Sequence, residues 1–382
     1  MDEKTCGKIS QPKRRGGAKR NRASNLVKGE RLLTLTRSSH TINHRKITMS
    51  IMQEQKHGTT TLFDPKDGNT IIEPPGKGPG HWAGAPNVYF DSTKRKFYLS
   101  YRLRKPHPQR GSESRIAEST DGLKFTDIWS VRKEDLETSS MERSALVVTS
   151  NGEYRLYISY VDPANNKWRI DMMEADSPEH FDISKRKSIL NADSLQVEGV
   201  KDPHFLILDG VYYMFFSYAP KLQSVSPEQI AHLHTTGDIF NTGKVKSVTG
   251  LATSQDGISF RWLRDVSLLG TGWDSHTARV TCVLPARSGF TIFYDGASDG
   301  ERNYEEFTGI ATSSDLLHYK RISLERPVLV SPFGTGSLRY IHAIRVDNDF
   351  YFYYECSRPD GSHDLRLNIV KKKNLEILGL DN

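Results

Sequence analysis

Cysteine and long apolar runs are both scarce in this chain of 382 residues. Its three cysteines are too few and too scattered for a disulfide framework, and Cys282 and Cys356 fall in strand-like segments, where we expect buried thiols. No apolar run approaches the roughly 20 residues that span a bilayer, which argues against a membrane helix. No apolar core of about 7–15 residues follows the basic N-terminus, so we expect no secretory signal and favour a cytoplasmic location.

Charge is distributed unevenly along the chain, whose formal net charge is +7. Residues 1–50 contain 13 Lys and Arg against three Asp and Glu, whereas the remaining residues contain 40 against 43. Little apolar periodicity and many Ser, Gly and Asn predict a disordered basic tail over residues 1–57. Three interpretations stay open: a nucleic-acid or nuclear-import patch, an organelle transit segment, or translated sequence upstream of a start at Met49 or Met52. Any nucleic-acid binding is expected from this tail alone.

Strand pairs recur along the rest of the chain. Five segments open with polar or charged residues and continue as strands, at 84–90, 142–147, 201–206, 276–280 and 341–346. Each is followed by a turn and an aromatic-rich strand, at 96–101, 154–160, 211–218, 290–294 and 350–354. A period of roughly 60 residues built from strand pairs is typical of a propeller, whose blades bury their faces against one another. We therefore predict an all-β fold, a five-bladed β-propeller over residues 58–382.

A second repeat lies out of phase with the first. Segments 117–125, 252–260 and 311–319 share one pattern, in which Ala-x-Ser or Ala-Thr-Ser leads to an Asp and then to an aromatic residue. Asp-Gly between strand-like runs favours a tight hairpin, because glycine readily adopts positive φ angles. We interpret these segments as the outer hairpins of the blades.

The third repeat carries a recognisable motif. Val200-Lys201-Asp202-Pro203-His204-Phe205, followed by Asp209-Gly210-Val211-Tyr212-Tyr213, resembles the Asp-Pro strand and Asp-Gly-x-Tyr-Tyr hairpin of five-bladed propeller glycosidases. This superfamily includes invertases, arabinanases, β-xylosidases and anhydro-galactosidases. The resemblance in repeat pattern covers about residues 80–370, and it implies an enzyme that hydrolyses glycosidic bonds of an oligosaccharide or glycoside in a central funnel, with no cofactor.

The resemblance also implies roles for particular residues. Three blades of such enzymes supply a base or nucleophile, an orienting aspartate and an acid, because acetal cleavage needs one group to protonate the leaving oxygen and another to act on water or carbon. Asp202 matches the orienting aspartate. The first blade departs from the pattern, since Ala85-Pro86 leaves Asn87 as the nearest polar group. In the fourth blade His276 stands near the acid position, as in the anhydro-galactosidase branch; a structural histidine is the alternative.

Two glutamates are candidates for the missing carboxylate. Glu142 begins the inner strand of the second blade, and Glu198 precedes Asp202 by four residues. A glutamate at the head of an apolar strand is unusual, which favours Glu142 as a catalytic partner of Asp202 and His276. The alternative role for Glu142 is a salt bridge with Arg143.

Other inner-strand residues are candidates for binding. Trp82 could pack on a sugar face and His81 could bind a hydroxyl, or Trp82 could only close the seam of the propeller. His342 matches a histidine that arabinanase-like propellers place near the axis, where a cation is sometimes found; one histidine does not define a metal site, so we assign no metal.

Arginines also gather at the inner strands, at Arg143, Arg279, Arg339 and Arg345. A guanidinium suits a carboxylate or phosphate, so these residues predict an acidic sugar, or phosphate as the attacking group as in the related mannoside phosphorylases. Ion pairs with nearby acids are the structural alternative. A catalytically silent propeller that binds glycans remains a further alternative to the enzyme.

Overall fold

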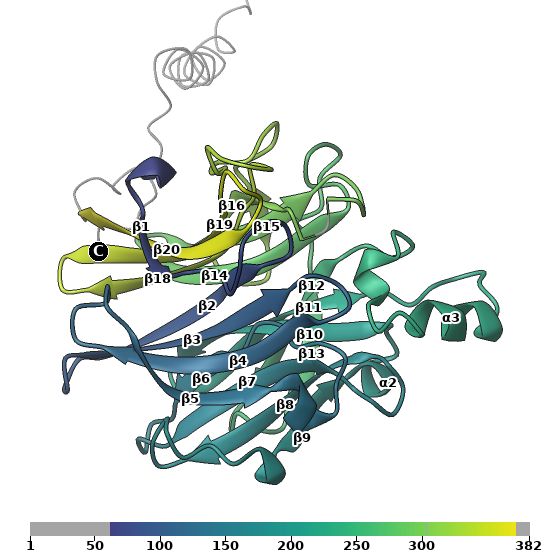
Figure 1. Ribbon diagram of the computed structural model, residues 1–382, viewed down its shortest axis with the longest axis horizontal. Helices are drawn as coiled ribbons and strands as arrows, with labels where there is room; N and C mark the ends of the chain where they lie inside the picture. Colours follow the sequence, from purple (N-terminus) through teal and green to yellow (C-terminus); the bar gives the residue numbers. More distant parts are fainter. Residues whose placement is uncertain (1–61, 303, 372–382) are drawn as a thin grey trace, which may run out of the picture. The chain divides into compact units, whose positions relative to one another are not determined.

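The computed structural model describes residues 62–302 and 304–371, which form five antiparallel blades arranged as a β-propeller (Figure 1). The predicted all-β propeller is thus confirmed. Blades 2, 3 and 4 are separate four-stranded sheets, whereas blades 1 and 5 are joined in one sheet. The predicted basic tail, residues 1–57, lies outside the described residues.

Each blade runs outward from an inner strand near the axis. Blade 1 contains β2 (Trp82–Asp91), β3 (Lys96–Lys105), β4 (Arg110–Ser119) and β5 (Thr126–Arg132). Blade 2 contains β6 (Ala145–Val148), β7 (Tyr154–Val161), β8 (Trp168–Ala175) and β9 (Lys187–Asn191). Blade 3 contains β10 (Gly199–Leu208), β11 (Val211–Ala219), β12 (Val248–Ser254) and β13 (Arg261–Val266). Blade 4 contains β14 (Thr277–Ala286), β15 (Gly289–Ala297), β16 (Phe307–Ser313) and β17 (Tyr319–Arg321).

Blade 5 combines both ends of the described chain. Its strands are β18 (Leu338–Val346), β19 (Asp349–Ser357), β20 (His363–Lys371) and, at the outer edge, β1 (Asn69–Ile72). β1 pairs antiparallel with β20, and a single parallel pair, Trp82 with His363, joins β20 to β2 of blade 1. The ring is therefore closed by strands from opposite ends of the sequence.

Helices are short and lie between strands. Within residues 62–302 and 304–371 the α-helices are α2 (Ala192–Leu195) and α3 (Pro227–His234), and the 3-10 segments are η1 (Pro65–Asp67), η2 (Lys133–Leu136), η3 (Ile183–Lys185) and η4 (Ile239–Asn241). α3 begins at Ser226, whose side chain accepts from the Gln229 N–H in a capping box. It belongs to the long β11–β12 connection and stands away from the sheets in Figure 1. Phe240 of the same connection is buried in a cluster with Trp168 of blade 2.

The predicted hairpins lie between the third and fourth strands of blades 1, 3 and 4, with Asp-Gly in blades 1 and 3 and Asp315-Leu316 in blade 4. Asp121 accepts hydrogen bonds from the backbone N–H groups of Leu123 and Lys124, and Gly122 has φ +73°. Asp256 and Asp315 make the same pair of contacts in blades 3 and 4. These hairpins were predicted from the sequence, and their backbone hydrogen bonds lower the pKa of Asp121.

Apolar clusters fill the spaces between blades. Tyr157 of blade 2 packs with Met214 and Phe216 of blade 3, and equivalent clusters occupy the other four interfaces. Cys282 and Cys356 are free, buried thiols in one of these clusters, as expected. Within the described ranges no helix is long and apolar enough to cross a membrane.

Candidate active site

The inner strands bring five equivalent positions together around the axis. β2, β10, β14 and β18 each contain a bulge at this level, and Ala85, Asp202 and Tyr340 adopt positive φ angles of 54°, 56° and 55° there. A bulge redirects side chains and interrupts pairing. Gly84, Lys201 and Arg339 directly precede their bulges, and Arg279 precedes Val280, where the β14 bulge begins. With Glu142 of the segment leading into β6, they form five equivalent positions.

Asp202 lies in this layer and is almost fully buried. Its Oδ2 accepts from Arg279 Nη1 and from the Tyr340 hydroxyl, each at 3.2 Å, and lies 3.5 Å from Lys201 Nζ. Its Oδ1 accepts from the Arg143 N–H at 3.2 Å. Blades 2, 3, 4 and 5 therefore all contribute to holding this one carboxylate.

Glu142 belongs to the same charged layer, and its partners among the described residues are Arg102 and Arg104 instead of Arg143, the partner that the sequence suggested. Its Oε2 lies 3.0 Å from Arg102 Nε and its Oε1 lies 3.0 Å from Arg104 Nη1. Burial alone would raise the pKa of Glu142, but Arg102, Lys201 and Arg104 together lower this pKa to about 2. Glu142 is thus ionised at neutral pH and does not serve as a proton donor.

Two further carboxyl groups flank Arg279. Glu306 Oε1 accepts from Arg279 Nη2 at 2.6 Å, while Asp295 Oδ2 lies 3.4 Å from the same nitrogen. Burial raises the pKa of Asp295 to about 7, and the negative charge of Glu306 adds to this effect. Attraction to Arg279 and Arg339 outweighs burial for Glu306 and lowers its pKa. Asp295 is therefore a carboxyl group able to carry a proton near neutral pH.

His276 lies apart from the Asp202 contacts. It precedes β14 and is half-buried, and the charges that affect it most are those of Asp299, Lys246 and Glu306. Burial lowers the pKa of His276, so the ring is mainly neutral at pH 7. Glu198 is likewise engaged elsewhere, because its Oε2 lies 2.8 Å from His234 Nε2. The structure places Asp202 and Glu142 in one layer and His276 outside it.

Arg143 fills the axis beneath Asp202. Its guanidinium donates to the carbonyl oxygens of Thr281 at 2.8 Å and Pro86 at 2.9 Å, and Nη2 lies 3.1 Å from His342 Nδ1. Burial and the nearby Arg143 charge lower the pKa of His342 to about 3. Among the described residues no cluster of three or more His, Cys, Asp or Glu side chains forms a metal site. Arg143 and His342 thus join blades 1, 2, 4 and 5 through direct contacts.

The predicted sugar-binding residues of blade 1 are enclosed by protein. Trp82 is stacked on His363 with ring centroids 4.6 Å apart, and the guanidinium groups of Arg104 and Arg339 lie about 5 Å from its ring. Since Trp82 forms the β2–β20 pair, it lies at the seam of the propeller. Asn87 is buried and its Oδ1 accepts from the Leu146 N–H at 2.9 Å. His81 is half-buried at the start of β2.

The sequence analysis missed the charged residues that come from second strands and from connections. Glu355 contacts Arg102, Arg339 and His363, at 2.9, 2.7 and 2.8 Å. Arg102, Asp295 and Glu355 each follow a tyrosine near the end of an aromatic strand, which was the available signal. Arg345, by contrast, is exposed near the far end of β18 and lies away from this layer.

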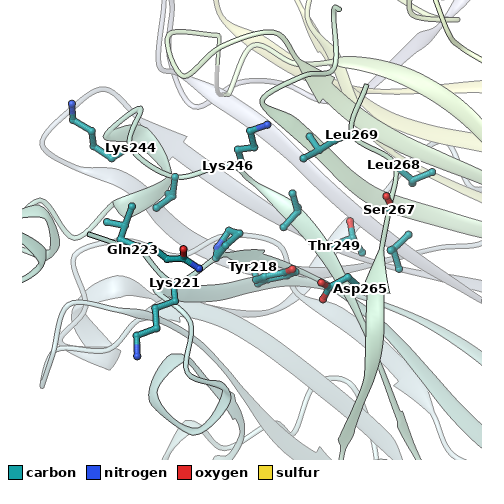
Figure 2. Close-up of a pocket in the computed structure, with 15 residues that line it drawn as sticks. Tyr218, Lys221, Gln223, Lys244, Lys246, Thr249, Asp265, Ser267, Leu268 and Leu269 are labelled. Carbon is teal, nitrogen blue, oxygen red and sulfur yellow. The ribbon is translucent and has the colours of Figure 1, made fainter. Parts of the chain in front are cut away.

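A separate hollow of about 440 Å³ lies over blade 3, away from the charged layer. It is lined by the ends of β11, β12 and β13 and by the β11–β12 connection. Figure 2 shows Tyr218, Thr249 and Asp265 on its inner side, with Lys221, Lys244 and Lys246 around it. Its walls are largely apolar, and it contains none of the predicted catalytic residues.

The fold is similar to that of several solved structures. No family model and no curated protein sequence matches the chain. Among solved structures it is similar to a β-1,2-mannobiose phosphorylase from Listeria innocua, with TM-score 0.54, 17% identity, and coverage of 81% of this chain and 95% of that one. A glycosyl hydrolase from Bacteroides ovatus gives TM-score 0.52 and 15% identity over 80% and 92% of the two chains.

A thermostable family-43 glycoside hydrolase matches with TM-score 0.52 and 13% identity, over 79% of this chain and 91% of that one. The matches include both hydrolases and a phosphorylase, all at low identity. They confirm the predicted resemblance at the level of the fold, a five-bladed propeller of the kind that glycoside-processing enzymes have.

Proposed function

We propose that this chain, which shares its propeller with glycoside hydrolases and a phosphorylase, is a carbohydrate-active enzyme that hydrolyses glycosidic bonds at the propeller axis. The observation that carries the proposal is that Asp202 and Asp295 both contact the buried Arg279. Acetal cleavage needs a proton donor and a second group that acts on water or on the sugar carbon. Asp295, whose pKa burial raises, and Glu142, whose pKa its cationic neighbours lower, are suited to these two tasks.

Each residue then has a stated task. Asp295, whose pKa burial raises to about 7, donates a proton to the leaving oxygen. Asp202 orients the sugar, as the resemblance of its motif implies, and Glu142, which its cationic neighbours keep ionised, takes a proton from the attacking water. His276, the acid suggested by the sequence, is less suited because burial lowers its pKa and its main electrostatic neighbours exclude Asp202.

The test is the substitution Asp202→Asn, assayed with a panel of aryl glycosides and oligosaccharides. We expect turnover to be lost while the protein still folds, with a lowered thermal unfolding midpoint because Arg279 and Lys201 lose a buried negative charge. Asp209→Asn is the matched control, since Asp209 is exposed at the β10–β11 turn with φ +49°, which asparagine tolerates. Unchanged turnover by Asp202→Asn would remove Asp202 from the mechanism. Sugar binding by the wild type without any product would instead support the silent propeller.

A second candidate reaction is phosphorolysis, in which phosphate replaces water. Lys201 Nζ favours it: Lys201 is fully buried, and this ammonium has no hydrogen-bond partner among the described residues. An anion beside Lys201 would satisfy those donors. Reactions run with and without inorganic phosphate separate the two candidates, because phosphorolysis yields a sugar 1-phosphate only when phosphate is present and hydrolysis yields the free sugar in both.

A further inference from the structure

Tyr304 covers the charged layer from the connection that precedes β16. It is 4% exposed and has φ +82°, a backbone conformation that is rare for a bulky residue and is found where surrounding contacts enforce it. Its hydroxyl lies 2.8 and 2.7 Å from the two carboxylate oxygens of Asp238. Asp238 is in turn paired with Arg110 Nη2 at 2.9 Å. The contact therefore links connections of blades 1, 3 and 4.

Three cations from three blades face the Tyr304 ring. Its centroid lies 4.5 Å from the Arg104 guanidinium, 5.2 Å from Lys201 Nζ and 5.8 Å from the Arg339 guanidinium. Arg104 and Arg339 also pair with carboxylates, whereas the one carboxylate near Lys201 Nζ is Asp202 at 3.5 Å, and the rings of Trp168 and Phe240 lie 5.1 and 4.9 Å from this nitrogen. The ring thus fills a space that is lined by positive charge. The Lys201 ammonium in this space has no hydrogen-bond partner among the described residues.

Tyr304 makes contacts of kinds that a sugar can also make. A phenol and a pyranose are both six-membered rings that carry a hydroxyl, and Asp238 already accepts a hydroxyl hydrogen bond. Trp82 lies at the side of the ring, with centroids 6.4 Å apart. A phenol, however, offers these cations only its π face, and a carboxylate pairs with guanidinium and ammonium groups more strongly.

We propose that Tyr304 occupies a subsite for an acidic sugar, a hexuronate, and leaves it when the substrate enters. This inference rests on the proposed function, and it adds the substrate class. The sugar carboxylate contacts Lys201 and Arg104, and a ring hydroxyl takes the place of the Tyr304 hydroxyl on Asp238. While Tyr304 is in place, it blocks access to Asp202 and Asp295.

The experiment measures binding, so it does not depend on turnover. Tyr304→Gly empties the subsite and suits the positive φ angle, because glycine adopts it without a steric cost. Glucuronate and galacturonate are titrated against wild type and variant by calorimetry, with glucose and galactose as neutral counterparts. We expect the hexuronates to bind the variant at least about tenfold more tightly than the wild type, the neutral sugars to gain much less, and high salt to weaken the hexuronate gain.

A second variant keeps the proposal testable if Tyr304→Gly does not fold. Tyr304→Phe keeps the ring but loses both contacts to Asp238, so we expect a smaller gain for the hexuronates, about two- to fivefold. Tyr157→Phe is the matched control, because Tyr157 is also buried and donates its hydroxyl to the Gly257 carbonyl in another interface at 2.6 Å. This control should leave hexuronate binding unchanged.

The outcomes are distinct. Equal gains for acidic and neutral sugars, or no hexuronate gain in a folded Tyr304→Gly protein, would overturn the subsite. Binding of inorganic phosphate alone to that variant would also overturn it and would assign Lys201 to phosphorolysis. If the hexuronates bind as expected but Asp202→Asn leaves turnover unchanged, the subsite stands and the catalytic proposal fails. The two proposals therefore fail separately.

Discussion

Blades 1 and 3 occupy equivalent positions around the axis but fill the centre in opposite ways. In blade 3 the inner strand itself carries the charged side chains, Lys201 and Asp202. In blade 1 the equivalent residues are Gly84 and Ala85, and the second strand provides Arg102 instead. The five blades share one limited volume at the axis, so a large side chain from one strand requires a small residue on another.

Removing Glu142, the anion that neutralises Arg102 and Arg104 of blade 1, should lower the free energy of unfolding most. Glu142→Ala leaves Arg102 and Arg104 without this partner, and breaking a buried ion pair costs about 3–5 kcal/mol. Urea unfolding followed by tryptophan fluorescence measures the loss. Glu174→Ala is the control, since Glu174 pairs with Arg155 and Lys187 in a partly exposed site, where a lost pair costs about 1 kcal/mol or less. Equal losses would contradict the buried network.

The side of the network that adjoins Asp202 of blade 3 can be tested by pH through Asp295 of blade 4. Because burial raises the folded pKa of Asp295 to about 7, whereas an unfolded aspartate titrates near 4, the folded state keeps a proton in this interval that the unfolded state releases. Stability contributed by this proton is present below about pH 4 and is lost as the pH rises to about 7. An asparagine at this position does not titrate, so the Asp295→Asn variant does not lose stability in this way.

We therefore expect the stability of Asp295→Asn, relative to the wild type, to rise between about pH 4 and 7, by at most about 4 kcal/mol. Unfolding in urea at several pH values gives the difference directly. Asp209→Asn, at an exposed turn, should show no such slope. Parallel pH profiles of Asp295→Asn and the wild type would show that Asp295 is ionised throughout.

Adding a side chain at Gly84 of blade 1 should lower the free energy of unfolding by less than removing the Glu142 carboxylate does. A Cβ at Gly84 would lie 1.8 Å from Glu355 Oε2, so Gly84→Ala must displace a carboxylate that contacts Arg102 and Arg339. Overpacking of a filled interior costs about 1–3 kcal/mol. Gly272→Ala is the control, because no atom lies within 4 Å of its added Cβ. The thermal unfolding midpoint should be lowered in Gly84→Ala and unchanged in Gly272→Ala.

We expect the smallest loss of stability at a feature that blades 1 and 3 share, a side chain that accepts a hydrogen bond from a backbone N–H of the next blade. Asn87 Oδ1 accepts from the Leu146 N–H of the next blade, as His204 Nε2 accepts from the Val283 N–H. Asn87→Ala leaves a buried N–H unsatisfied, which costs about 1–3 kcal/mol, and we expect the lower end of this range. Asn165→Ala removes an exposed hydrogen bond and should be nearly neutral. A neutral Asn87→Ala would assign no stabilising role to this contact between blades.

The sequence predicted the fold well, because strand pairs are a local pattern repeated in every blade and the Asp-containing hairpins recur in blades 1, 3 and 4. It also identified Asp202, Glu142, Arg143, Arg279 and His342 as residues of the axis, since each lies on or just before an inner strand. It missed Glu355, Glu306 and Tyr304, because their positions depend on how blades 3, 4 and 5 pack together. The burial of the whole layer also follows from that packing, and no local pattern indicates it.

The pairing of β1 with β20 has a consequence for synthesis on the ribosome. Asn69 is made about 300 residues before its partner Leu367. At roughly 5–20 residues per second, the first strand waits about 15–60 s for its neighbour to be translated. During that time its edge is open to other chains, and its short length of four residues limits what such a chain can gain by adding to it.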